Sequence, residues 1–190
     1  QCLDHIDELE AHRKEIESEI LRIAEPFSAV LDLLYTLPGL NKNPMTAIAI
    51  LSEIGPDMSV FPSSKHLISW AGCCPRNDQS NQKVKSRRIS RAGSYLKPLL
   101  VQVANALIKS KKHPEFKERY HRIKSRRGHK KAIIAVCKML LTAIWNMLSK
   151  LEPYNPEGFL EHRPVKQEKT LTVSQALELL RLRGYTIANQ

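Results

Sequence analysis

Residues 130–150 read KKAIIAVCKMLLTAIWNMLSK, and this stretch decides the fold class. Its apolar residues recur at intervals of three and four, which places them on one face of an α-helix: they are Ile133, Val136, Met139, Leu140, Ala143, Ile144, Met147 and Leu148. Residues 94–110 repeat the pattern, and Pro98 fits there only if it lies in the first turn of the helix. The repeating residues are Tyr95, Leu96, Leu99, Leu100, Val103, Ala104, Leu107 and Ile108. No alternating pattern persists elsewhere, so we predict an all-α fold built around a compact helical bundle.

The N-terminal residues 3–37 form one long heptad pattern. Ten of the eleven a and d positions between Cys2 and Leu37 are apolar, with Arg13 as the exception, and this predicts a coiled-coil helix that kinks or breaks at Pro26. Such a helix would join copies of the chain into a homo-oligomer. The alternative is a single amphipathic helix that lies on its own domain.

Residues 35–56 are typical of two helices joined by a tight turn. Pro38-Gly39 ends the first helix, Asn43 caps the second with Pro44 in its first turn, and Gly55-Pro56 stops it. We expect its buried face to carry Ala47, Ile48, Leu51 and Ile54. The unit resembles a helix-hairpin-helix, which binds DNA phosphates through backbone amides, here those of Gly39 and Asn41. Asn41 stands where such motifs usually carry a second glycine; the alternative is a plain helical turn.

Shorter elements complete the predicted organisation. A short helix capped by Ser63 or Ser64 would bury Leu67, Ile68 and Trp70, and residues 109–131 form a basic connection with helical patches. After a loop over 152–164, a last helix would be capped by Thr172 or Ser174 and end at Gly184. We divide the chain into a coiled-coil helix (1–34), a helical domain (35–151), and a loop with a C-terminal helix (152–190).

Charge is distributed unevenly along the chain. The net charge is +11 in total, −5 over residues 1–27 and +15 over residues 76–131. A basic block of this size is typical of a surface that binds a polyanion, although a merely solvated face is the alternative. No apolar run approaches the length of a membrane span and the first residues do not form a signal peptide, so we expect a cytoplasmic protein without a membrane partner. The four cysteines fit reduced thiols.

The carboxylates do not predict a metal site within this chain. The acids after residue 57 are scattered over exposed faces and the tail, with Asp78 alone in the basic loop. A nuclease with two metal ions needs several carboxylates at one place. We therefore expect no cofactor in this chain.

The basic loop holds a serine that could act as a nucleophile. Residues 75–96 read PRNDQSNQKVKSRRISRAGSYL, with Ser80 among Arg76, Lys83, Lys85, Arg87, Arg88 and Arg91. Cations around a serine lower its pKa and stabilise a pentavalent phosphate, so Ser80 could attack a DNA phosphodiester. The alternatives are that Ser80 only hydrogen-bonds a turn, or that Ser86, Ser90 or Ser94 is the reactive residue.

The following segments occur in this order along the chain: LPGL, AIAILSEIG, LISWAGCCPRNDQS, RISRAGSYLKPLLVQVA and RRGHKKAIIAVCKMLLTAIWNML. Together they resemble the C-terminal domain of the IS110 insertion-sequence transposases, also called the IS116 family. The resemblance covers about residues 33–150, and residues 1–32 resemble the coiled coil that precedes this domain. It implies a DNA recombinase that cleaves and exchanges strands through a phosphoserine intermediate. Family members also have an N-terminal DEDD domain that binds Mg²⁺, which this chain lacks, so the chain would be inactive alone.

The resemblance also implies roles for individual residues. Ser80 is the serine that follows the Ala-Gly-x-x-Pro run, so it would be the nucleophile, but Asn81 and Gln82 replace the small residues that commonly follow it. The bases around Ser80 would contact phosphates, and a second nucleic-acid patch would comprise Lys124, Arg126, Arg127, His129, Lys130 and Lys131. Implied partners are DNA and, as in some members, a guide (bridge) RNA, in a prokaryotic, nucleoid-associated setting. The alternatives are a non-catalytic nucleic-acid-binding module, a remnant of a decayed element, and a coiled-coil interaction protein.

Overall fold

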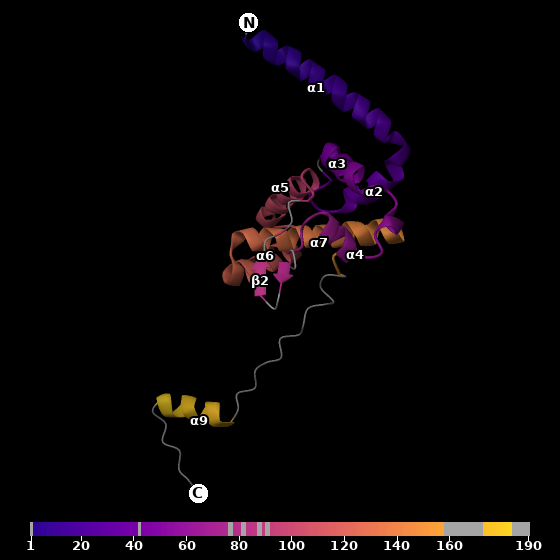
Figure 1. Ribbon diagram of the computed structural model, residues 1–190. Coiled ribbons are helices and arrows are strands. Elements are labelled where there is room, and N and C mark those ends of the chain that lie inside the picture. The colour runs from indigo at the N-terminus through magenta and orange to yellow at the C-terminus, as the bar shows by residue number, and fades with distance from the viewer. Residues whose placement is uncertain are drawn as a thin grey trace. The chain divides into compact units, whose positions relative to one another are not determined.

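The computed structural model shows a helical protein with one short β-hairpin (Figure 1). The all-α prediction is confirmed, and the hairpin is an addition to it. The chain forms two compact units, Gln1–Pro156 and Glu157–Gln190; the predicted division at residues 34 and 151 stays a prediction. The structure describes residues 2–41, 43–75, 78–80, 83–86, 89, 92–157 and 173–183.

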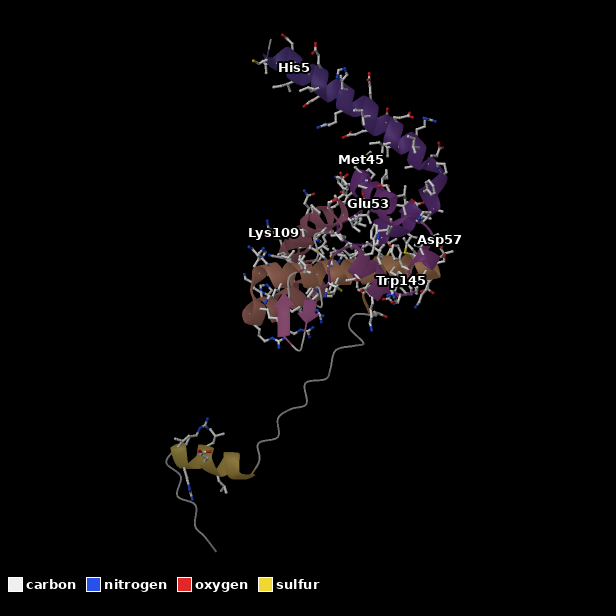
Figure 2. All side chains as sticks on the ribbon, in the orientation of Figure 1. His5, Met45, Glu53, Asp57, Lys109 and Trp145 are labelled. Atoms are coloured by element: carbon white, nitrogen blue, oxygen red, sulfur yellow. The ribbon has the colours of Figure 1, made fainter. Side chains whose placement is uncertain are left out.

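The N-terminal heptad pattern corresponds to two helices and not to one. α1 (Cys2–Ala24) passes into the 3₁₀ turn η1 (Glu25–Phe27), and α2 (Ser28–Thr36) follows. Pro26 lies in η1, so the predicted break at this residue is confirmed. Of the residues in α1 only Ala24 is buried, whereas α2 buries Leu31 and Leu34. The large apolar residues of α1 are exposed apart from Ile20, which is half-buried, and Figure 2 shows side chains, His5 among them, projecting around the helix.

α3 (Pro44–Ile54) begins as the sequence predicts. The side chain of Asn43 accepts a hydrogen bond of 3.0 Å from the backbone N–H of Met45, and Pro44 occupies the first turn. Its buried residues are Ala47, Ile50, Leu51 and Ile54. Ile50 therefore takes the buried place expected for Ile48, which is only half-buried, because Ile50 shares one helix face with Ala47, Leu51 and Ile54.

The turn between α2 and α3 packs closely against a later helix, α5 (Leu96–Lys109). Gly39 has a φ of +90°, which favours glycine, and a Cβ added there would lie 2.8 Å from Cγ1 of Val103. Pro38 and Leu40 in this turn are buried. The residues of the turn thus contribute to the core as well as to the surface.

The short helix α4 (Ser64–Trp70) follows the 3₁₀ turn η2 (Met58–Val60). Leu67 and Ile68 are buried as predicted, but the prediction that Trp70 is buried is wrong, since 45% of its surface is exposed. The ring of Trp70 meets Phe61 edge-on, with centroids 5.7 Å apart. This contact therefore covers only part of the indole.

The core is built around α7 (His129–Lys150), which α2, α4, α5 and α6 (Pro114–Arg127) contact (Figure 1). The predicted helices over 94–110 and 130–150 are confirmed, whereas the predicted basic connection is a full helix, α6. Tyr95 is not part of the buried face of α5 as expected: it precedes the helix and is 77% exposed. Side chains of α7 that are fully buried include Val136, Leu140, Leu141 and Ile144.

α7 is long and apolar enough to cross a membrane by length and composition, and 56% of its apolar window is buried inside the protein. Its contacts with four other helices account for that composition. Trp145 of α7, labelled in Figure 2, donates its indole N–H to the carbonyl oxygen of Phe61 at 2.9 Å. This bond connects α7 to the segment between η2 and α4.

The chain after α7 is tied back onto the bundle at Tyr154. Its backbone N–H donates to the Thr36 hydroxyl at 2.9 Å, and its own hydroxyl donates to Glu115 at 3.1 Å. Its ring also stacks on Phe116. The second unit contains α9 (Val173–Leu182), which confirms the predicted C-terminal helix. Of its two predicted caps, Ser174 lies inside the helix, while Thr172 and the predicted end Gly184 lie outside the described residues.

Candidate nucleic-acid interface

Ser80 is the last residue of a short β-hairpin. β1 (Asp78–Ser80) pairs with β2 (Lys83–Ser86) in antiparallel register, with Ser80 opposite Lys83 and Gln79 opposite Val84. A further bridge between Pro75 and Ile89 continues the pairing. The backbone therefore brings one lysine directly opposite the candidate nucleophile at the end of the hairpin.

The hairpin was missed in the sequence for a physical reason. Strands of three and four residues are too short to establish an alternating pattern, and the Asn81-Gln82 connection lacks the glycine that marks most two-residue hairpin turns. The spacing of two residues between Lys83 and Lys85 was the one sign of a strand in the sequence of this segment. Sequence reasoning therefore described this segment only as a loop.

Two glycines allow the segments before and after the hairpin to pack against each other at its base. Gly72 and Gly93 have φ values of +66° and +68°. A Cβ added at Gly72 would overlap the carbonyl oxygen of Ala92, and one added at Gly93 would overlap that of Ala71. The Nζ of Lys97 would lie 2.9 Å from the Cβ added at Gly72. The contact thus requires glycine in both segments, and the ammonium group of Lys97 lies beside it.

A second basic feature lies at the junction of α6 and α7, which we call the α6–α7 basic cluster. Gly128, with a φ of +79°, ends α6 and precedes the first residue of α7. This tight junction brings the last turn of one helix next to the first turn of the other. Its members are all exposed: Lys124, Arg126, Arg127, His129, Lys130 and Lys131.

Tyr120 supports this cluster from inside α6. It is a buried residue whose hydroxyl lies 2.8 Å from Nδ1 of His129, and the Nζ of Lys124 lies 5.5 Å from the centre of its ring. Tyr120 thereby fixes the position of His129 and contacts Lys124. Sequence reasoning did not identify Tyr120, which resembles any other buried aromatic residue of an amphipathic helix.

The electrostatics of the two helix ends differ. Cations in the last turn of α6 stabilise the negative end of its dipole. In α7, however, His129, Lys130 and Lys131 begin the helix at its positive end, with no acid in the first turn and no side-chain cap. Lys130 and Lys131 are therefore unfavourable for α7 itself, and no described carboxylate forms an ion pair with the cluster. Local choices of this kind are typical of sites that bind a ligand of opposite charge.

Some of the remaining predicted site residues lie in the described part of the chain and others lie outside it. Lys83 and Lys85 lie in β2, while Arg76, Arg87, Arg88 and Arg91 lie outside the described residues. Gly39 and Asn41 lie in the turn between α2 and α3, Gly39 partly buried and Asn41 exposed. Leu151 is the one non-glycine residue with positive φ in the described part, so Asn41 does not take the conformation of the missing second glycine.

The described residues do not form a metal site. Among them, no three His, Cys, Asp or Glu side chains are grouped so that they could hold a metal ion. The cysteine side chains of the described part are free, with Cys73 and Cys137 buried. Burial raises the pKa of both thiols, that of Cys137 to about 12, so the thiol form dominates at neutral pH.

The described residues thus form an all-α body with a short hairpin that contains two lysines and a basic junction between α6 and α7. Residues 31–121 match the family model described as Transposase IS116/IS110/IS902 family, and this match confirms the resemblance noted in the sequence.

Curated relatives point the same way. The chain is 30% identical over 125 residues to the pilin gene-inverting protein of Moraxella bovis, and 29% identical to that of Moraxella lacunata. In both cases the match covers 65% of this chain and 38% of the relative, so the chain spans about two fifths of the curated relatives it matches. No solved structure matches the chain.

Proposed function

We propose that this chain is the DNA-binding, serine-donating part of a recombinase of the insertion-sequence type. The observation that carries the proposal is the hairpin register, in which Ser80 ends β1 opposite Lys83, within the segment that matches the transposase family. The hairpin places the backbone of Ser80 at the end of β1, next to the connection with β2. The opposing lysine provides positive charge at the same position of the backbone.

The proposed reaction is nucleophilic attack on the DNA backbone. The hydroxyl oxygen of Ser80 would bond to phosphorus and lose its proton, while one P–O bond of the strand breaks and its leaving oxygen gains a proton. Lys83 and the other bases of residues 76–91 would stabilise the negative charge of the pentavalent transition state and lower the pKa of the serine. Strand exchange is the reverse attack on the phosphoserine by another strand end.

Two further surfaces would hold the DNA. The α6–α7 basic cluster provides charge without competing carboxylates in the described part of the chain, and the first turn of α7 directs its amides and its dipole toward an anion. The turn between α2 and α3 would act as the helix-hairpin-helix: Asn43 already caps Met45, and no described group accepts a hydrogen bond from the N–H of Gly39 or Asn41.

The reaction would require more than this chain. A preceding DEDD domain would bind Mg²⁺, and the described residues offer no metal cluster in its place. The exposed apolar residues of α1 would pair with a second copy in a coiled coil. The partners would be DNA and, as in some members of the family, a guide RNA, in the cytoplasm near the nucleoid.

The test is a covalent-adduct assay in a full-length protein that contains this chain. With a labelled DNA substrate, wild type and Ser94→Ala should form an adduct that survives denaturation, and Ser80→Ala should form none while it still binds DNA. Ser94 is a matched control because it is an exposed serine of the same segment. An adduct formed by Ser80→Ala would show that Ser80 is not the nucleophile.

The α6–α7 basic cluster separately favours a second candidate, a non-catalytic nucleic-acid-binding module. This candidate predicts salt-sensitive DNA binding by the wild type without any covalent adduct. A filter-binding titration against salt, run beside the adduct assay, distinguishes it from both the recombinase and a coiled-coil interaction protein, which would show no salt-sensitive binding.

A further inference from the structure

We propose that Trp70 and Tyr95 form a stacking platform for unpaired bases at the base of the Ser80 hairpin, so that the ligand held there is single-stranded nucleic acid. The proposal rests on the proposed function and adds to it the form of the ligand. Bases inside a duplex are already stacked on one another, whereas unpaired bases can stack on exposed aromatic rings.

Trp70 is exposed and yet held in one position. It is the last residue of α4, and its ring meets the buried ring of Phe61 edge-on at an interplanar angle of 62°. The carbonyl oxygen of Phe61 in turn accepts the hydrogen bond from Trp145 of the core helix α7. With 45% of its surface exposed, Trp70 offers indole surface that needs little ordering when a base stacks on it.

No capping or packing contact among the described residues explains why a tyrosine occupies position 95. It is the N-cap residue of α5, where Ser, Thr, Asp or Asn would satisfy a backbone amide, and it makes no capping hydrogen bond. Its 77% exposure excludes a packing role in the described part of the chain. An exposed aromatic residue at a position that favours a small polar one is typical of a binding contact.

The contact of Gly72 and Gly93 at the base of the hairpin brings Trp70 and Tyr95 near each other. Trp70 directly precedes Ala71, Tyr95 is two residues after Gly93, and Gly93 packs against the carbonyl of Ala71. Because consecutive Cα atoms are 3.8 Å apart, the Cα atoms of Trp70 and Tyr95 are at most about 16 Å apart. Both rings are therefore within reach of a few successive nucleotides of one strand.

The charges around the platform favour a polyanion over an apolar partner. Lys97 lies in the first turn of α5 with its Nζ at the glycine contact, and this turn contains no acid. Lys65 is exposed on α4. A phosphate backbone can contact these lysines while its bases stack on the neighbouring rings, which is the usual combination in single-strand binding.

Tryptophan fluorescence of the 190-residue chain tests the proposal. The chain contains two tryptophans, Trp70 and Trp145, so quenching that is present in wild type and absent in Trp70→Phe reports on Trp70. We expect oligo(dT) to quench Trp70, and an abasic oligonucleotide of equal length to bind without quenching. Tyr95→Ala should weaken oligo(dT) binding by about fivefold or more, since stacking contributes roughly 1–3 kcal/mol per base.

The controls separate stacking from charge. Tyr95→Phe should retain wild-type affinity, and Leu182→Ala, which removes an equally exposed apolar residue of α9, should have no effect. The salt dependence of binding should be unchanged in Tyr95→Ala, because no phosphate contact is lost. Equal loss of duplex and oligo(dT) affinity in Tyr95→Ala, or equal quenching by the abasic strand, would overturn the proposal. If the wild type binds DNA in a salt-sensitive way but neither quenching of Trp70 nor an effect of Tyr95→Ala is observed, only the stacking platform is refuted. If the wild type does not bind DNA at all, the proposed function is refuted.

Discussion

The hydroxyl of Tyr120 lies 2.8 Å from Nδ1 of His129, and this contact joins the buried side of α6 to the first residue of α7 across Gly128. The two rings also meet edge-to-face, with centroids 5.8 Å apart. A tight glycine junction alone would leave the angle between the helix ends free to vary. The Tyr120–His129 contact therefore fixes where the α6–α7 basic cluster is presented.

Tyr120→Phe tests this role. The variant keeps the ring packing and removes the hydrogen bond, so we expect the free energy of unfolding to fall by about 0.5–1.5 kcal/mol. Tyr35→Phe is the matched control, because no described group forms a hydrogen bond with the Tyr35 hydroxyl. Urea unfolding of both variants provides the measurement. Equal effects of the two substitutions would contradict a special role of Tyr120.

Neutralising Lys130 and Lys131 should change stability and DNA binding in opposite directions. Both residues oppose the dipole of α7, so Lys130→Gln/Lys131→Gln should raise the free energy of unfolding by about 0.3–1 kcal/mol per charge at low salt. If each lysine neutralises one phosphate, the log–log slope of DNA affinity against salt should fall by about 1.8 in total.

Lys150→Gln is the control on the same helix. Lys150 lies in the last turn of α7, where a cation is favourable, so its loss should lower stability slightly and leave the salt slope unchanged. Thermal unfolding and filter binding give the two readouts. A salt slope that is unaffected by the double substitution would remove Lys130 and Lys131 from the interface.

The glycine contact at the base of the hairpin should tolerate no side chain. Gly72→Ala introduces both a strained φ and an overlap with the Ala92 carbonyl, so we expect a loss of about 3 kcal/mol or more in the free energy of unfolding. Gly55→Ala is matched to it, since φ is +74° but no atom lies within 4 Å of the added Cβ. That variant should lose about 1–3 kcal/mol, from the strained backbone conformation alone. Similar losses for the two variants in urea unfolding would show that the overlap is relieved.

The buried thiols should make the protein less stable in alkali. Burial raises the pKa of Cys137 from 9.0 to about 12. A raised folded-state pKa gives stability that is full below pH 9 and is lost as the pH rises toward 12, because the unfolded state releases its proton first. Cys137→Ala should remove this part of the pH dependence when unfolding is measured between pH 8 and pH 11.

Thiol labelling provides the companion measurement. At pH 8 a maleimide should modify the exposed Cys2 rapidly, and Cys73 and Cys137 only when the protein unfolds. Rapid labelling of Cys137 in the folded protein would contradict its burial in α7.

Periodicity predicted the long helices because packing around α7 follows the same apolar spacing that the sequence displays. It failed where burial depends on distant parts of the chain. Trp70 and Tyr95 both have apolar character, and no local pattern reveals that Phe61 covers only part of Trp70, or that α5 begins after Tyr95. The predicted heptad seam continued through α2, whose Leu34 is buried in the body instead.

The candidate site was predictable in part for a similar reason. Charge alone identified the basic segments, because net charge needs no knowledge of geometry. The pairing of Ser80 with Lys83 depends on a hairpin too short for a periodic signal, and the contact of Tyr120 with His129 depends on the turn at Gly128. Family resemblance selected Ser80 from its neighbouring serines, which local composition could not do.

The glycine contact between Gly72 and Gly93 has a consequence for how such proteins diversify. The two ends of the intervening segment meet in direct backbone contact, so the helical body already fixes the spacing between them. The residues from Cys74 to Ala92 can then be lengthened, shortened or exchanged between relatives as a cassette, while the bundle around α7 keeps its sequence. A change in this segment therefore requires no compensating change in the core.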